Sequence, residues 1–224
     1  MQQTTKDNSM DTVLTPLLQS PKLPGYVREL TDYLKAEEER REEFLRTLRD
    51  DQKAEFINGE IVYHSPAKEM HNFIRQNLEF IFSRFARQRK LGAVRGEKAM
   101  VKLTRNDFEP DICFFSGKKF QQVKEDTLFY PAPDFVVEIL NKSTEKIDRG
   151  IKKDDYVLHG VQEYWIVNPD TREVEQYLLA DEQYELKEKI GHGTVRCAVL
   201  QGLEIPLTAI FEEEANESFL RNLD

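Results

Sequence analysis

The chain has 224 residues, of which 39% are hydrophobic, and a formal net charge of −9 at pH 7. This length and apolar content fit one packed domain with an appendage, and no window is apolar enough to span a membrane. The acidic balance disfavours general binding to nucleic acid, which depends on Lys and Arg neutralising phosphates. A locally basic cleft, or a metal ion held by carboxylates, still permits such binding.

Two features of the sequence bear on its location. The first thirty residues lack the basic start and the apolar stretch of a secretion signal. Cys113 and Cys197 both lie in apolar runs, which predicts free core thiols rather than a disulfide or a zinc site. The protein is therefore expected in the reducing cytoplasm, with no membrane partner.

The N-terminal part divides into two segments. Residues 1–25 are rich in Gln, Thr, Ser and Pro without a sustained apolar pattern, which predicts a disordered tail. Residues 26–51 combine a dense mixed-charge block with apolar residues at helical spacings: Leu30, Leu34, Phe44, Leu45 and Leu48. We expect a helical extension here, which either packs on the main domain, 52–224, through its ends or serves as an arm for self-association.

A hairpin and a long helix are expected next. Asn58-Gly59 lies between two short β-prone runs and predicts a tight turn, with Glu60 directly after it. After Pro66 a helix is predicted over 68–90, because apolar residues repeat at i, i+4, i+7 and i+11: Ile74, Leu78, Ile81 and Phe85.

Polar residues of this predicted helix have two interpretations each. His71, near its start, is either a surface or capping residue or an accessory site residue close to Glu60. The cations of its polar face are either solvated or in contact with phosphates. Arg75 on this helix and Arg149 further along the chain are the candidates for nucleic-acid contact.

Further along the chain, one acidic residue precedes an apolar strand and another lies within one. A strand with Gly96 as a bend is expected over 93–103, and a proline then marks the entrance of Asp111 into a buried run. Glu138 interrupts a second run, which is apolar enough to be covered on both faces. A lone carboxylate there must be paired, protonated or bound to a metal, because desolvating the bare charge is costly. Asp111 by itself also fits a turn residue.

A helix over about 148–159 and a strand from Tyr164 complete a crossover that starts at the Glu138 strand. On this helix Asp148, Lys152 and Tyr156 repeat at i, i+4 and i+8, so they share one face. If that face looks toward Glu138, Lys152 reaches the acids. Otherwise Lys152 forms a surface ion pair with Asp148, which contributes little.

Two strand carboxylates suggest a site for a hard divalent cation. Mg²⁺, or Mn²⁺ in its place, takes oxygen ligands, usually one or two carboxylates with waters and substrate phosphate oxygens. Asp111 and Glu138 are the candidate ligands. Such an ion activates water and neutralises charge on a phosphodiester, and Lys152 would orient the water or stabilise the transition state.

Several blocks of the sequence resemble one known family when they are taken together. They are NGEIVYHSPAKEMH, PDICFF, PDFVVEILNKST and DRGIKKDDYVLHGVQEYWIVNP, in this order. Over about 55–210 they resemble the Uma-two family of restriction-endonuclease-like proteins, within the PD-(D/E)XK nuclease superfamily. The resemblance implies an α/β fold, a restriction-endonuclease-like mixed β-sheet flanked by helices. It also implies Asp111 and Glu138 as metal-binding acids, with Glu60 as a third ligand.

The chain departs from the superfamily pattern at one important position. The pattern places a lysine two residues after the second acid, where this chain has Leu140. In the Uma-two family that lysine has moved to the next helix, which matches Lys152, and Tyr156 follows as an accessory residue. Asn141 stands where a serine is common, which is a small polar exchange.

Two functions from different classes follow as hypotheses. The first is a Mg²⁺-dependent endonuclease that cleaves DNA, with Asp111 and Glu138 holding the ion and Lys152 assisting the water. It would act as a homodimer, because superfamily enzymes that cut both strands commonly do. The second is a non-catalytic nucleic-acid or protein interaction module that retains the nuclease fold. The acidic charge and the displaced lysine favour the second, and the retained acid, acid, lysine set favours the first.

Overall fold

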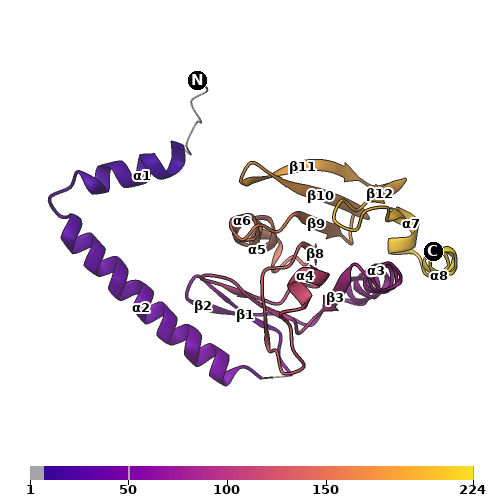
Figure 1. The fold of residues 1–224 in the computed structure, drawn as a ribbon, viewed down its shortest axis with the longest axis horizontal. Coiled ribbons are helices and arrows are strands. Elements are labelled where there is room, and N and C mark those ends of the chain that lie inside the picture. The colour runs from indigo at the N-terminus through magenta and orange to yellow at the C-terminus, as the bar shows by residue number, and fades with distance from the viewer. Residues whose placement is uncertain (1–7, 50, 224) are drawn as a thin grey trace. The chain divides into compact units, whose positions relative to one another are not determined.

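The computed structural model describes residues 8–49 and 51–223, and the chain divides into two compact units, Met1–Leu48 and Arg49–Asp224. Figure 1 shows both units as ribbons. No helix among the described residues is long and apolar enough to cross a membrane.

Within its described residues, the first unit consists of two helices, α1 (Asn8–Leu18) and α2 (Leu23–Thr47). The prediction of a disordered tail over 1–25 does not hold for Asn8–Leu18, and residues 1–7 lie outside the described residues. Apolar residues at i, i+1, i+4 and i+5 give α1 a helical repeat within a polar segment: Val13, Leu14, Leu17 and Leu18.

The second unit contains three β-sheets and six helices in the described residues. Its elements in chain order are β1 (Ala54–Ile57), β2 (Glu60–Tyr63), α3 (Glu69–Gln88), β3 (Gly92–Gly96), β4 (Met100–Lys102), β5 (Asp107–Phe108), β6 (Ile112–Ser116), α4 (Gly117–Phe120), β7 (Phe129–Tyr130), β8 (Phe135–Ile139), α5 (Glu145–Arg149), α6 (Ile151–Leu158), β9 (Glu163–Asn168), β10 (Glu173–Ala180), β11 (Gln183–Ile190), β12 (Thr194–Arg196), β13 (Glu204–Pro206), α7 (Leu207–Phe211) and α8 (Glu213–Asn222).

The central sheet has six strands in the order β11-β10-β9-β8-β6-β3. Strands β8 and β9 are parallel, and the other neighbours are antiparallel, so the sheet is mixed. A second sheet has the order β2-β1-β5-β4-β7, and β12 pairs with β13. The expected α/β class, with a mixed sheet flanked by helices, is confirmed.

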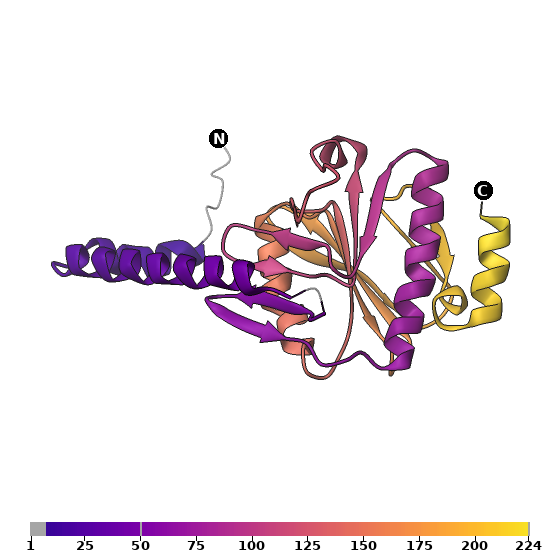
Figure 2. The ribbon, with the colours of Figure 1, turned by 90° about the horizontal axis from the view of Figure 1, so that it is seen from below.

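Each face of the central sheet carries its own hydrophobic core. Along β8, Phe135, Val137 and Ile139 pack with α3, α7 and the C-terminal part of the chain. Val136 points to the opposite face, toward α6 and the second sheet. Successive strand residues alternate between faces, so Glu138 shares the face of Val136. Figure 2 shows α3 and α8 together on one side of this sheet.

Helix α3 forms where its periodicity predicts it. Its four repeated apolar residues are each at most 1% exposed: Ile74, Leu78, Ile81 and Phe85. Phe82 widens this stripe and meets the rings of Phe135 and Trp165 edge-on, at centroid distances of 5.2 and 5.7 Å. Such aromatic pairs add about 0.5–1.5 kcal/mol beyond area burial. The helix is thereby anchored beside the strand that carries Glu138.

The hairpin also forms as predicted. Strands β1 and β2 pair so that Ile57 lies opposite Glu60. The turn residues Asn58 and Gly59 have φ values of 49° and 87°. Positive φ at both central positions is the requirement of a type I′ turn, for which Asn-Gly is the preferred sequence.

Two sequence predictions need correction at glycines. The strand expected over 93–103 is two strands, since β3 ends at Gly96 and β4 joins a different sheet. The helix expected over 148–159 is also two, α5 and α6, which meet at Gly150. A Cβ at Gly150 would lie 2.9 Å from the carbonyl oxygen of Lys146, so the close approach at this joint requires glycine.

Candidate active site

Asp111, directly before β6, and Glu138, on the adjacent strand β8, lie side by side. In the antiparallel pairing of β6 with β8, Ile112 lies opposite Val137, and the next positions in this register are Asp111 and Glu138. The Ile139 N–H donates to Asp111 Oδ2 at 2.9 Å, and the Asp111 N–H donates to Glu138 Oε2 at 3.4 Å. The two acids that the sequence singles out are therefore brought together on one face of the central sheet.

Asp111 is held by a lysine and a histidine. Lys53 Nζ lies 2.7 Å from Asp111 Oδ1, and His71 Nε2 lies 3.1 Å from Oδ2. His71 comes from the first turn of α3, and it is buried. The structure therefore places His71 beside Asp111 and not on the surface. Burial by itself would raise the pKa of Asp111, but Lys53 and His71 hold that pKa well below its ordinary value.

Glu138 faces the crossover helix. Its Oε1 lies 3.1 Å from Lys152 Nζ and accepts a 3.3 Å hydrogen bond from the Tyr156 hydroxyl. Both partners come from α6, and both are at most 1% exposed. The predicted shared face of Asp148, Lys152 and Tyr156 does look toward Glu138, even though Gly150 interrupts the helix. The alternative of a surface ion pair is wrong, because the Asp148 to Lys152 contact of 3.2 Å is buried.

Asp111, Glu138, Asp148 and Lys152 form a buried cluster of charged residues. Glu55 on β1 also belongs to this cluster, and it was not predicted from the sequence. Its Oε1 lies 2.9 Å from Lys152 Nζ and accepts the Glu109 N–H at 2.8 Å, while its Oε2 lies 2.9 Å from His64 Nε2. Burial opposes ionisation, but Lys152 and His64 lower the pKa of Glu55 to about 2. The available signal was an acid amid apolar residues in a short strand, the same signal that identified Glu138.

Carboxylates outnumber lysines in the cluster. Four buried carboxylates, those of Glu55, Asp111, Glu138 and Asp148, share the ammonium groups of two lysines, and Glu55 and Asp111 each contact one imidazole as well. Burial raises the pKa of Glu138 from its ordinary 4.5 to about 8, although the ammonium of Lys152 opposes this rise. Burial raises the pKa of Asp148 as well. The site therefore favours an additional positive charge, from a proton or a metal ion.

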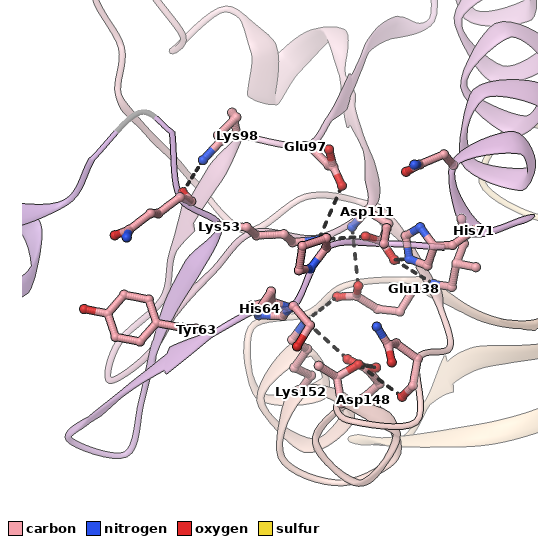
Figure 3. Close-up of a pocket in the computed structure, with 18 of the residues that line it drawn as sticks. Lys53, Tyr63, His64, His71, Glu97, Lys98, Asp111, Glu138, Asp148 and Lys152 are labelled. Carbon is pink, nitrogen blue, oxygen red and sulfur yellow. Dashed lines mark hydrogen bonds and ion pairs between the residues drawn. The ribbon is translucent and has the colours of Figure 1, made fainter. Parts of the chain in front are cut away.

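Asp111, Glu138 and Asp148 border a pocket of about 580 Å³ (Figure 3). Its lining includes Lys53, His71, Asp111, Glu138, Asp148 and Lys152. No group of three or more His, Cys, Asp or Glu side chains is arranged to hold a metal in residues 8–49 and 51–223. Mg²⁺ commonly uses only one or two carboxylates, with waters and phosphate oxygens filling the other positions. The oxygen donors of Asp111 and Glu138, in a cluster short of positive charge, fit such an ion.

Three other predicted site residues lie apart from this pocket lining. Glu60 is exposed at the start of β2. Arg75 donates to Glu79 at 2.9 Å, across one turn of α3. Arg149 donates to both carboxylate oxygens of Glu175, at 2.7 and 3.1 Å, and to Glu145 at 2.9 Å.

The fold places the protein in the restriction-endonuclease-like structural class. The structure is similar to that of a putative nuclease belonging to DUF820 from Anabaena variabilis, with a TM-score of 0.66 and 19% identity, over 80% of this chain and 97% of that chain. The family model Uma2, described as putative restriction endonuclease, matches residues 41–208, and the chain belongs to this family. No curated protein matches the chain significantly. The family expected from the motifs is confirmed.

Proposed function

We propose that the protein is a metal-dependent endonuclease that hydrolyses phosphodiester bonds of DNA. The observation that carries this proposal is the position of Asp111 and Glu138, which lie opposite one another at the edge of one pocket. Membership of a restriction-endonuclease family supports the reaction class. Asp111 and Glu138 would hold Mg²⁺ or Mn²⁺, which when bound supplies Lewis-acid activation of water and neutralises phosphate charge.

The protein side chains would place and stabilise the reacting groups. In hydrolysis, a water oxygen bonds to phosphorus while one P–O ester bond breaks. The water loses a proton to solvent, and the leaving oxygen takes one up. Negative charge grows on the phosphate oxygens in the transition state, so a preorganised cation beside Asp111 lowers the barrier. His71 holds the orientation of Asp111 through its 3.1 Å contact.

Self-association of the N-terminal unit is also proposed, as a homodimer in the cytoplasm. On α2, Val27, Leu30 and Leu34 follow at i, i+3 and i+7 and are 53%, 57% and 53% exposed. This spacing is that of the a and d positions of a coiled coil. A second copy of the same helix would cover this stripe, and an enzyme with two active sites could cut both strands of a duplex.

A non-catalytic interaction module is the second candidate, favoured by one observation. The ammonium of Lys152, the expected catalytic lysine, is 1% exposed and engaged by three carboxylates. If no other cation contacted the substrate, the cluster would stabilise the fold without taking part in catalysis.

Cleavage of supercoiled plasmid separates the two candidates. The wild type is expected to nick DNA with Mg²⁺ or Mn²⁺ and not with EDTA, and Asp111→Asn is expected to abolish nicking. Glu60→Gln is the matched control, because this acid is exposed and lies outside the pocket lining. Binding of DNA without cleavage would support the interaction module. Nicking that survives in Asp111→Asn would indicate a contaminating nuclease.

A further inference from the structure

The position of Lys152 limits what this lysine can do. Its Nζ lies 2.9 Å from Glu55, 3.1 Å from Glu138 and 3.2 Å from Asp148. Three carboxylates surround this ammonium, and one of these contacts is a 3.1 Å hydrogen bond to Glu138 Oε1. Lys152 borders the pocket, but only 1% of its side chain is exposed, so it is poorly placed to reach a substrate phosphate. Its contacts suit a cation that holds the acids together.

Lys53 lies on the other side of the acids, where the pocket is open. Its Nζ contacts Asp111 Oδ1 at 2.7 Å and lies 3.9 Å from Glu97 Oε1, and 19% of its side chain is exposed. In Figure 3, Lys53 extends toward Asp111 from the side of Glu97 and Lys98, away from Lys152 and Asp148. The contact with Asp111 uses one of its three N–H donors.

The fold holds Lys53 in this place. It directly precedes β1, and its carbonyl oxygen accepts the His64 N–H at 3.0 Å, which extends the hairpin by one pair. Residues two apart along a strand face the same side, so Lys53 and Glu55 both point to the cluster. Glu55 contacts the almost fully buried Lys152, and Lys53 contacts Asp111.

We propose that Lys53, rather than Lys152, is the catalytic lysine that contacts the scissile phosphate. This inference rests on the proposed function. Lys53 contacts Asp111, a carboxylate that would also hold the divalent ion. Lys53 and the ion would therefore compete for this carboxylate, and a Lys53 ammonium displaced from Asp111 would be available to the phosphate oxygens. The same lysine would thus oppose metal binding and assist hydrolysis.

This double role gives a signature that a purely structural lysine would not produce. Lys53→Met keeps most of the side-chain stem and removes the charge. Mn²⁺ binding, measured by titration calorimetry without nucleic acid, is expected to tighten several-fold in this variant, because one competing cation is lost. Single-turnover cleavage of an oligonucleotide duplex at saturating Mn²⁺ is expected to slow by about 10²-fold, the typical effect of losing one charge-stabilising donor. Lys53→Arg should recover part of the cleavage rate.

Lys146 provides a matched control. It is exposed on α5 and is not among the residues that line the pocket. Lys146→Met should leave both Mn²⁺ affinity and the cleavage step close to wild type. A general loss of positive potential would instead slow cleavage equally in the two variants.

The outcomes separate this inference from the proposed function. If the wild type binds Mn²⁺ and cleaves, but Lys53→Met cleaves equally fast or binds Mn²⁺ no more tightly, the assignment of Lys53 is overturned and the nuclease proposal stands. If the wild type neither binds Mn²⁺ nor cleaves, both proposals are overturned. Circular dichroism and thermal unfolding of each variant show whether a slower rate reflects loss of folded protein.

Discussion

The Nζ of Lys152 lies 2.9 Å from Oε1 of Glu55, and these two side chains are 1% and 0% exposed. The pair joins the first strand of the hairpin to the crossover helix that follows Glu138. Because the same ammonium also contacts Glu138 and Asp148, one lysine connects three segments of the chain. This arrangement indicates that Lys152 contributes mainly to the stability of the fold.

Lys152→Met is therefore expected to destabilise the fold strongly. Removing one partner of a buried ion pair leaves uncompensated charge and typically costs about 3–5 kcal/mol. Urea unfolding followed by circular dichroism measures this loss. Lys146→Met is the control, because Lys146 is exposed on the neighbouring helix and its loss should change the free energy of unfolding by less than about 0.5 kcal/mol. Equal stability of the two variants would contradict the central role of Lys152.

The stability of the metal-free protein should depend on the ionisation of Glu138. Burial raises the pKa of this group from 4.5 to about 8, so the folded state keeps a proton that the unfolded chain loses. The folded state then binds more protons between these two pH values, and the free energy of unfolding falls as pH rises through this window. Denaturant titrations in EDTA at several pH values measure the slope.

Glu138→Gln isolates this contribution. The neutral amide has the shape of the protonated acid, so the variant should show a flatter dependence between pH 4.5 and 8. Part of the slope is expected to remain, because burial raises the pKa of Asp148 also. An unchanged slope would show that Glu138 is ionised in the folded protein throughout this range.

Arg149 is expected to affect how the free energy of unfolding changes at acid pH. Burial opposes ionisation of Glu175, but hydrogen bonds from Arg149 and Tyr177 lower the pKa of this acid to about 2. Its stabilising contribution is complete above the ordinary pKa of 4.5 and is lost as pH falls toward 2. Arg149→Met should lower the free energy of unfolding by about 1–2 kcal/mol at neutral pH, allowing for solvent screening of a partly exposed guanidinium, and by less in acid.

The same variant tests the expected contact of Arg149 with nucleic acid. Its guanidinium already donates to Glu145 and Glu175, so DNA affinity measured by fluorescence anisotropy should change little in Arg149→Met. A large drop in affinity, with a reduced salt dependence, would instead identify Arg149 as a phosphate contact.

The exposed stripe of α2 predicts the oligomeric state. Leu30→Glu combined with Leu34→Glu places charge at the centre of the stripe, so light scattering should show a dimer for the wild type and a monomer for the variant. Lys35→Glu, on an exposed residue of the same helix, makes the same change in net charge outside the stripe and controls for charge alone. A wild type that is monomeric at micromolar concentration would exclude the stripe as a stable dimer interface.

Much of the fold was predictable because it is encoded locally. The apolar repeat from Ile74 to Phe85 specifies α3, and Asn58-Gly59 specifies the turn of the hairpin. Asp111 and Glu138 were identified because a carboxylate in an apolar strand requires a partner. The two glycine-related errors arose because a break between strands or helices is decided by a close backbone approach, which a periodic pattern does not contain.

The sequence by itself determined the class of fold, the family and the pair of strand acids. Only the tertiary structure decided which hairpin acid joins them, Glu55 rather than Glu60, and which of the two lysines bordering the pocket is the more exposed. The physical reason is that burial and ion pairing depend on how β1 and α6 pack around Glu138. Those contacts join residues far apart in the chain, so no local spacing could distinguish the enclosed Lys152 from the accessible Lys53.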